Sequence, residues 1–403
     1  MEILQLMDNF NASLYGGAGK VLIETGAVFL GEGNTVSVIS KSSDIPNETY
    51  FKGLKFYTYN DIDGNIFEKF IHYRAQSVIL FKEYLKKNKP GLILIHCSTA
   101  TLGIVKLIKK LRIPVIYYFH SPWHMEYEVI RKGGNSLTFN LLQYIRKRHE
   151  YKCLKQSSGI VTLSQSMRDE MLNHHPATAH IPYRIIPGGA NEKIFYPVKG
   201  KCEKSAGRKE LNLSENVFYI ISSRRLIPRT GVDLLIKAFK VIIDHYQAGK
   251  LSVKPELIIT GKGECETELK ELAAELNLKE YILFTGYISE EELAAYYRVS
   301  DLYVIPTRFL EGFGLSTVEA MASGLPVIGT DVGGTAEILS LIAPHLLIRA
   351  PESDLIAEKV LFMMNQDIGK RAENSFEIYK KEFRWGIHKK RLMEFFNELN
   401  DCN

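Results

Sequence analysis

Short, continuously apolar runs alternate with longer amphipathic stretches along almost the whole chain. In parallel sheets the connecting helices bury both faces of the strands, so such runs are typical of parallel strands. The sequence therefore predicts an α/β protein in which helices cover the sheets. The expected strands are Val36–Ser40, Leu92–His96, Val115–His120, Gly159–Leu163 and Ile185–Pro187, then Val217–Ser222, Glu256–Gly261, Tyr281–Gly286, Asp301–Ile305, Pro326–Thr330 and His345–Ile348.

A polar segment, "VKGKCEKSAGRKELNLSE", interrupts this alternation near the middle of the chain. We interpret it as the crossover between two α/β halves, each with a doubly wound sheet. The 403 residues suffice for two or three domains with full cores. We expect two Rossmann-like domains, residues 1–196 and 197–380, that face each other across a cleft. Ligands would bind beyond the carboxyl ends of the strands.

Composition narrows the range of partners. Hydrophobic residues make up 45% of the chain and charged residues 24%, as in ordinary soluble proteins. A net charge of +5 is too small to indicate nucleic-acid binding, but it fits an anionic substrate or an acidic membrane surface. The five cysteines lack metal-site spacing, and no run approaches the length of a membrane span. We expect reduced thiols and a cytoplasmic protein, because no signal peptide is recognisable.

The stretch "LYGGAGKVLIE" follows an apolar run at the N-terminus. It fails the P-loop pattern, which needs Ser or Thr after the lysine, where this chain has Val21. It also fails the dinucleotide fingerprint, because Leu22 stands where the third glycine belongs. Two interpretations remain open: an anion site at a helix N-terminus, or a tight turn without a ligand.

The segment "RFLEGFGLSTVEAMASG" combines glycines with two carboxylates ahead of a predicted helix. Gly312 and Gly314 stand where the helix begins, so its free N–H groups and positive dipole end could meet a phosphate. Glu319 lies two turns further on and could accept hydrogen bonds from ribose hydroxyls. The alternative is that Glu319 is a carboxylate on the helix surface.

Two further loops are predicted at the carboxyl edge of the second sheet. "SRRLIPRTG" delivers Arg224, Arg225 and Arg229 after a strand, and a guanidinium donates two hydrogen bonds to phosphate at once. The competing interpretation is a solvated cluster of charges. "IITGKGE" places Gly261 and Gly263 after the next strand.

These segments, in this order, resemble the retaining GT-B glycosyltransferases, in particular glycosyltransferase family 4 (GT4). The matching segments are "LYGGAGK", "HSPWH", "IIPGGANEKIFYP", "SRRLIPRTGVDLLIKAF" and the E-x7-E element from Glu311 to Glu319. The resemblance covers nearly the whole chain and is strongest from Val217 to Leu339. It implies that the first domain binds the acceptor and the second the nucleotide-sugar donor. Residues 381–403 would form a helix that returns to the first domain.

The resemblance also implies individual roles on the donor side. Glu319 would bind the ribose, Glu311 the donor sugar ring, and the backbone amides of 313–315 the sugar or the distal phosphate. Arg225 would clamp the diphosphate, which the first glycine-rich loop would face. The expected donor-binding residues are Gly16, Gly17, Arg225, Arg229, Gly261, Lys262, Tyr287, Ile288, Glu311, Gly312, Phe313, Gly314, Leu315 and Glu319.

For the chemistry, the resemblance implies transfer with retention at the anomeric carbon and without a metal or other cofactor. His120 would lie near the donor sugar and the incoming hydroxyl. The expected catalytic residues are His120, Glu311, Arg225 and Arg229. The family usually places a lysine where this chain has Thr230, and Arg229 is expected to supply that charge.

No metal site is expected from the histidines. His120 and His124 have i,i+4 spacing, but Pro122 between them argues against a helix. A second group lies in a polar segment and is interpreted as solvated: His174, His175 and His180.

The acceptor side is less defined. Ser121, where relatives often have glycine, and Trp123 are expected to contact the acceptor. The family suggests UDP-glucose as donor and a glycan or lipid-linked acceptor. Residues 120–155 include "IRKGGN" and "YIRKRHEYK", which favour either contact with the inner face of a membrane or a solvated amphipathic helix.

Two rival functions share this architecture. A nucleotide-sugar epimerase would release monosaccharide without an acceptor. A non-catalytic nucleotide-sugar-binding subunit would bind nucleotide and never turn over. Thr230, which stands in place of the family's usual lysine, is the reason to consider it. A nicotinamide dehydrogenase is disfavoured, because no G-x-G-x-x-G is followed by a suitably spaced acidic residue.

Overall fold

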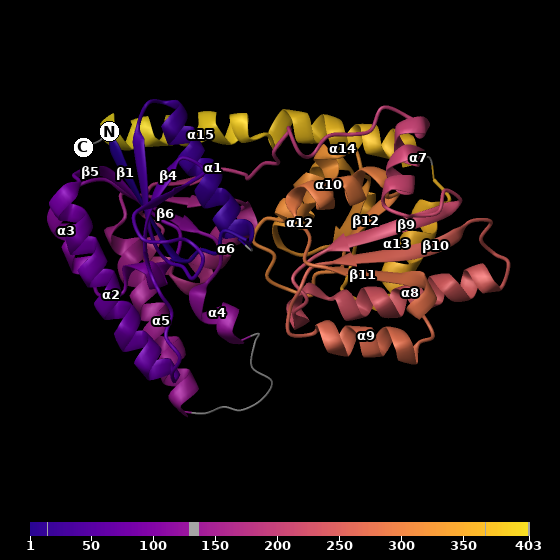
Figure 1. Ribbon diagram of the computed structural model, residues 1–403, viewed down its shortest axis with the longest axis horizontal. Helices are drawn as coiled ribbons and strands as arrows, with labels where there is room; N and C mark the ends of the chain where they lie inside the picture. Colours follow the sequence, from indigo (N-terminus) through magenta and orange to yellow (C-terminus); the bar gives the residue numbers. More distant parts are fainter. Residues whose placement is uncertain (14, 129–136, 367, 402–403) are drawn as a thin grey trace. The chain divides into compact units, whose positions relative to one another are not determined.

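The computed structural model describes residues 1–13, 15–128, 137–366 and 368–401 (Figure 1). The chain divides into two compact units, Met1–Ile186 with His388–Asn403, and Pro187–Ile387. Each unit is built on its own sheet, so the expectation of two Rossmann-like α/β domains is confirmed. The first boundary between the units, after Ile186, precedes the expected boundary at 196/197. The second, after Ile387, follows the expected boundary at 380/381.

The first unit holds an eight-stranded sheet in the order β3-β4-β2-β1-β5-β6-β7-β8. Its neighbouring strands are parallel, except that β3 runs antiparallel to β4. From β1 the chain builds outward to one side and then returns to β5 on the other, so the strand order reverses between β1 and β5. The strands are β1 (Glu2–Asn9), β2 (Thr35–Lys41), β3 (Thr49–Phe51), β4 (Leu54–Tyr59), β5 (Pro90–Ile95), β6 (Val115–Phe119), β7 (Gly159–Thr162) and β8 (Tyr183–Ile185). The helices are α1 (Gly17–Gly31), α2 (Ile66–Lys87), α3 (Val105–Leu111), α4 (Trp123–Glu128), α5 (Leu137–Gln156) and α6 (Gln165–His174).

The second unit holds a six-stranded parallel sheet in the order β11-β10-β9-β12-β13-β14. Here the order reverses between β9 and β12. The strands are β9 (Val217–Ser223), β10 (Lys254–Thr260), β11 (Ile282–Gly286), β12 (Leu302–Ile305), β13 (Val327–Thr330) and β14 (Leu347–Ile348). The helices are α7 (Lys201–Glu210), α8 (Val232–Gln247), α9 (Glu266–Glu275), α10 (Glu290–Val299), α11 (Leu315–Ala322), α12 (Gly333–Ile342), α13 (Ser353–Met364) and α14 (Ile368–Glu382).

Helix α8 illustrates how the amphipathic pattern builds the second core. Its apolar side chains recur every three to four residues and so share one face. That face packs against α13 and β10. Its buried residues are Val232, Leu234, Leu235, Ile236, Ala238, Phe239, Ile242 and Ile243.

Every expected strand overlaps an observed one, but the sequence analysis missed β3 and β4. Strand β4, "LKFYTY", carries Lys55 and Thr58 among its apolar residues, so it does not form a continuous apolar run. It lies next to the edge strand β3, where a mixed composition is tolerated.

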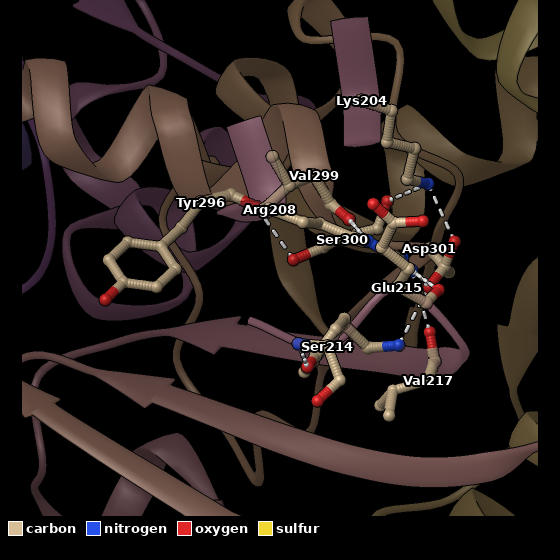
Figure 2. A network of polar contacts seen from close by, with 10 residues as sticks. Lys204, Arg208, Ser214, Glu215, Val217, Tyr296, Val299, Ser300 and Asp301 are labelled. Carbon is tan, nitrogen blue, oxygen red and sulfur yellow. Dashed lines mark hydrogen bonds and ion pairs between the residues drawn. The ribbon is translucent and has the colours of Figure 1, made fainter. Parts of the chain in front are cut away.

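The interpretation of "VKGKCEKSAGRKELNLSE" as a polar crossover is wrong in one respect, because this segment forms α7 and carries a buried arginine. Arg208 donates to Asp301 Oδ2 at 2.7 Å, and Lys204 donates to Asp301 Oδ1 at 2.7 Å (Figure 2). The Arg208 guanidinium also donates to backbone oxygens of Glu215, at 2.7 Å, and of Val217 and Val299, both at 3.0 Å. This network fastens α7 to the amino ends of β9 and β12.

The C-terminal stretch forms two helices rather than one. Helix α14 ends at Glu382, and α15 (Trp385–Asp401) begins after Phe383 and Arg384. From His388 onward α15 belongs to the first unit, where the ring of Phe396 lies 6.1 Å from that of Phe29. Across the described ranges, no helix is long and apolar enough to cross a membrane.

Candidate functional site

In the second unit, the loops that follow the strands gather at the carboxyl edge of the sheet. Open α/β sheets bind ligands at this edge, where the strand order reverses. Here that point lies between β9, which leads into Arg224 and Arg225, and β12, which leads into the loop containing Glu311. The expected donor-binding residues of this unit all lie in these edge loops or on α11.

A buried ion pair joins the two central loops. Arg224 Nη2 donates to Glu311 Oε2 and, at 2.9 Å, to the hydroxyl of Thr307. Thr307 also donates to Glu311 Oε2, at 3.1 Å. No described residue hydrogen-bonds Oε1 of Glu311, so this oxygen is available to a ligand. Sequence reasoning named Arg224 only as one of three arginines and gave it no role of its own, whereas Arg225 was assigned to the diphosphate.

The charge of Glu311 follows from this surrounding. Burial alone would raise its pKa, but the charge and hydrogen bond of Arg224, with the charge of Arg229 and the Thr307 hydroxyl, lower it below the ordinary value. Glu311 is therefore an ionised carboxylate at neutral pH, and it offers a hydrogen-bond acceptor to a ligand.

The neighbouring basic residues differ in their availability. Arg225 is exposed, and no described residue pairs with its guanidinium. Arg229 Nη1 donates to the backbone oxygen of Leu310 at 2.5 Å, which places its charge beside Glu311. Thr230, which stands where the family usually has lysine, is buried and donates to backbone oxygens of Arg225 and Ile227 at 2.8 and 2.7 Å. Thr230 is thus a turn-stabilising residue.

The amino end of α11 presents backbone amides at the same edge. Its first intrahelical bonds run from Thr317 and Val318 to the oxygen of Gly314, so the preceding amides have no helical partner. Glycine is required at 333, where φ is +56° and a Cβ would lie 2.1 Å from the oxygen of Glu311. The N–H of the next residue, Gly334, donates to the same oxygen of Glu311 at 3.0 Å. The sequence analysis did not single out Gly333 or Gly334.

Glu319 is 4% exposed on α11, so its interpretation as a helix-surface carboxylate is wrong. Burial raises the pKa of the nearby phenols Tyr297 and Tyr303, and the charge of Glu319 adds a smaller increase to both. The amphipathic pattern could not reveal this, because α11 is buried along most of its length.

The loops after β10 and β11 complete the edge. Gly261 has φ of +124°, and a Cβ there would meet the oxygen of Arg224 at 1.9 Å, so only glycine permits this packing. Its N–H donates to the oxygen of Gly286 at 2.8 Å, which ties the two loops together. Lys262 and Tyr287, which follow the two hydrogen-bonded glycines, are exposed, and Ile288 is half-buried.

In the first unit, the glycine-rich loop leads from β1 into α1. Leu14 lies outside the described residues, while Gly16 caps α1 and Gly17 begins it. Both glycines are exposed, and a Cβ on Gly16 would meet nothing within 4 Å. The loop is therefore an open helix N-terminus at the point where the strand order of this sheet reverses.

His120 follows β6 at the same edge of the first sheet. Its Nε2 lies 3.3 Å from Nδ1 of His96, which follows the neighbouring strand β5. Burial lowers the pKa of His120 to about 4, so its ring is neutral at physiological pH. The sequence analysis missed His96, although it too ends an apolar run at the carboxyl end of a strand.

The loop after His120 is held by a buried carboxylate. Glu150 on α5 accepts from the backbone N–H of Trp123 at 3.2 Å and from His175 Nε2 at 3.0 Å. Trp123, expected to contact the acceptor, is 8% exposed, and Ser121 is half-buried. The "IRKGGN" segment lies outside the described residues.

The interpretation of the second histidine group as a solvated loop is wrong. His174 ends α6 and bonds Glu170 at 3.1 Å, and His175 is buried against Glu150; His180 alone is exposed. Within the part of the chain that the structure describes, no group of three or more His, Cys, Asp or Glu residues could hold a metal ion.

Several solved structures share this architecture. Sucrose-phosphate synthase from Thermosynechococcus elongatus superposes with a TM-score of 0.80 over 100% of both chains, at 20% identity. Anabaena HepE in complex with UDP-glucose superposes with a TM-score of 0.73 over 99% of this chain and 100% of that one, at 18% identity. The fold is therefore GT-B, as expected.

Sequence comparisons extend this result to the family. An uncharacterized glycosyltransferase of Methanocaldococcus jannaschii is 25% identical over 81% of this chain and 79% of its own length. Mannosylfructose-phosphate synthase of Agrobacterium fabrum is 27% identical over 77% of this chain and 67% of its own length. The family model described as "Glycosyltransferase Family 4" matches residues 15–193, and the model described as "Glycosyl transferases group 1" matches residues 203–382. The chain thus belongs to the group 1, family 4 glycosyltransferases.

Proposed function

We propose that the protein transfers a hexose from UDP-glucose to a hydroxyl of a glycan or lipid-linked acceptor, with retention at the anomeric carbon and without a metal ion. The observation that carries the proposal is the ionised Glu311, whose Oε1 is available beside the open amino end of α11 and the exposed Arg225. HepE, which shares the fold, binds UDP-glucose, and this supports the choice of donor.

In this proposal the second unit binds the donor by charge and hydrogen bonds. Arg225 and Arg229, with the amides that begin α11, neutralise the diphosphate, a task that other enzymes give to a metal ion. Glu319 accepts hydrogen bonds from the ribose, and Glu311 accepts one from the glucose ring. Lys262, Tyr287 and Ile288 border the base.

The reaction breaks the bond between the anomeric carbon and the diphosphate oxygen. The acceptor hydroxyl forms the new bond on the same face of the sugar, and its proton passes to the departing phosphate oxygen, so UDP leaves with the charge that the arginines stabilise. His120, uncharged at physiological pH, orients a substrate hydroxyl rather than accepting its proton, because its pKa is about 4.

Calorimetric titration with UDP in the presence of EDTA tests the donor site. We expect wild-type protein to bind UDP, and Glu319→Ala to bind it at least about tenfold more weakly, since each hydrogen bond to a charged group contributes about 1.5–3 kcal/mol. Glu358→Ala, at an exposed position on α13, is the control and should bind as wild type does. ADP and GDP identify the base.

The outcomes also separate the rival functions. Release of free glucose epimers from the nucleotide sugar would favour the epimerase. Tight UDP binding without any turnover would favour the non-catalytic subunit. Wild-type protein that binds none of the nucleotides would refute the donor site.

We further propose that one face of the first unit contacts an anionic membrane surface, where a lipid-linked acceptor would lie. On α5 the exposed side chains include Leu141, Tyr144 and Ile145, with exposed fractions of 58%, 59% and 39%. The exposed basic residues are Arg148, Lys152 and Lys155 on α5 and Lys106, Lys109 and Lys110 on α3. The one carboxylate of α5, Glu150, is buried, and α3 has none, so these two helices present no exposed negative charge.

Vesicle flotation tests this contact. We expect binding to phosphatidylglycerol vesicles but not to phosphatidylcholine vesicles. Replacing Arg148, Lys152 and Lys155 by glutamine should weaken partitioning about 100-fold, because each basic residue near an anionic surface contributes about 1 kcal/mol. The same change in charge on the second unit, at the exposed Lys237, Lys250 and Lys279, should have no effect. Equal partitioning of both triple variants would contradict the proposal.

A further inference from the structure

A chain of buried polar groups crosses the first sheet where its strand order reverses. Gln5 on β1 is fully buried, His96 directly after β5 is 3% exposed, and His120 follows β6. The three strands are neighbours in the sheet. The proposed reaction uses only His120, so Gln5 and His96 need an explanation of their own. Buried polar groups are retained where their hydrogen bonds are made.

The direction of the first hydrogen bond is fixed by a backbone carbonyl. Gln5 Nε2 lies 3.2 Å from the oxygen of Leu22 in α1, and a carbonyl oxygen can only accept. The Gln5 amide is therefore oriented with its nitrogen toward Leu22 and its Oε1 toward His96 Nε2, 2.8 Å away. Because Oε1 can only accept, His96 must carry its hydrogen on Nε2.

The orientation then passes to His120. Burial, with smaller contributions from His120 and His388, lowers the pKa of His96 well below its ordinary value, so the ring is neutral and its Nδ1 holds a lone pair. His120 Nε2, 3.3 Å from that Nδ1, can only donate to it. The hydrogen of the neutral His120 thus lies on Nε2, and its Nδ1 is an acceptor. No described residue donates to this Nδ1.

We propose that Gln5 and His96 are positioning residues that hold His120 in the Nε2–H tautomer, so that its Nδ1 accepts a hydrogen bond from a substrate hydroxyl. This inference rests on the proposed function, because it assumes that His120 meets the substrate. In the opposite tautomer His120 would present an N–H to the hydroxyl. The same ring would then orient the hydroxyl by its oxygen instead of its hydrogen.

The first test is spectroscopic and needs no activity. Long-range ¹H–¹⁵N correlation spectra of histidine-labelled protein distinguish Nε2–H from Nδ1–H, and His120→Asn identifies the His120 signals. We expect both His96 and His120 in the Nε2–H form at pH 7. A His120 signal of the Nδ1–H type in the wild type would overturn the inference.

Two variants at His96 separate hydrogen bonding from packing. His96→Gln can donate its amide N–H to Gln5 and accept from His120 through its oxygen, which reproduces the order of the chain. His96→Leu cannot do either. Both lose the imidazole that stacks on Tyr118 with ring centres 4.7 Å apart, so a purely structural role would affect them equally. Tyr118→Phe keeps that stacking ring and serves as a further control.

We expect His120 to keep the Nε2–H form in His96→Gln and to become a mixture of tautomers in His96→Leu and Gln5→Met. For release of UDP from UDP-glucose, kcat/KM should fall about tenfold in His96→Leu, the factor that an ordinary hydrogen bond supplies. It should return to within about twofold of wild type in His96→Gln. Equal losses in both His96 variants would overturn the inference.

The two failures are distinguishable. If His120 has the expected tautomer and the protein neither binds UDP nor releases it from UDP-glucose, the proposed function fails and the assigned tautomer stands. If UDP is released but His120 is of the Nδ1–H type, only the positioning role fails. Should His96→Leu not fold, the wild-type spectrum and the His96→Gln variant still decide.

Discussion

Replacing Arg225 by methionine is expected to lower the rate of UDP release from UDP-glucose about 10²–10³-fold, the usual loss when one donor to a developing negative charge is removed. The free energy of unfolding should not change, because the Arg225 guanidinium is exposed and unpaired among the described residues. Methionine retains much of the aliphatic stem, so the change isolates the charge. Steady-state kinetics and urea unfolding measure the two quantities.

The adjacent arginine provides a matched variant that, unlike Arg225→Met, should lower the free energy of unfolding. Arg224→Met removes the partner of Glu311, both side chains being nearly buried, with 8% and 11% exposed. Breaking such a pair costs about 3–5 kcal/mol, since the remaining charge is buried without compensation. A variant Arg225→Met that releases UDP at the wild-type rate would refute its assignment as the diphosphate clamp.

The pH dependence of Arg224→Met has a definite sign. In the wild type Arg224 helps to hold the pKa of Glu311 below its ordinary value, so the ion pair stabilises the fold above the unfolded-state pKa of about 4.3. That contribution is lost as the pH falls through the lowered pKa. The deficit of Arg224→Met relative to wild type should therefore be largest near pH 7 and shrink below about pH 4. A deficit independent of pH would point to lost packing instead.

Arg224 and Arg225 show which features of the site the sequence can predict and which it cannot. A loop after an apolar strand lies at the carboxyl edge of a parallel sheet, so the position of the loops containing Arg225, Gly261 and Glu311 could be predicted from periodicity alone. Which of two adjacent arginines points inward could not, because that depends on the partner that β12 brings beside β9. Glu311 lies 87 residues from Arg224 along the chain.

The sequence analysis overlooked three further polar residues for the same reason. His96 and Gln5 resemble ordinary polar residues at the end of a strand and within one, and their meaning comes from neighbours 91 residues apart. Arg208 stands in a polar stretch that resembles a linker, and only the carboxylate that precedes β12 makes it a buried anchor. Local patterns determine elements and edges, whereas pairing across the sheet determines which polar side chains are buried.

Asp301→Asn is expected to lower the free energy of unfolding of the second unit by about 3 kcal/mol. Asp301 accepts from Arg208 and Lys204 through different oxygens (Figure 2). Its Oδ2 also accepts from the backbone N–H of Tyr219 at 2.8 Å. Asparagine keeps the shape but removes the charge and turns one acceptor into a donor. The Arg208 guanidinium, 7% exposed, then remains buried without a carboxylate.

Tryptophan fluorescence can follow this unit by itself. The chain has two tryptophans, and in a Trp123→Phe background the remaining Trp385 lies in the second unit. Asp244→Asn is the matched control: its pair with Lys240 is largely exposed on α8, and its loss should cost no more than about 0.5 kcal/mol.

The double variant Arg208→Met with Asp301→Leu distinguishes a buried unpaired charge from lost packing. Replacing both partners by apolar residues removes the charge that Asp301→Asn leaves stranded, so part of the lost stability should return. The recovery stops short of wild type, because the oxygens of Glu215, Val217 and Val299 lose a donor, and Lys204 and the N–H of Tyr219 lose an acceptor. If the double variant is less stable than Asp301→Asn alone, the penalty comes from these groups left without partners and not from the guanidinium, and the charge argument is wrong.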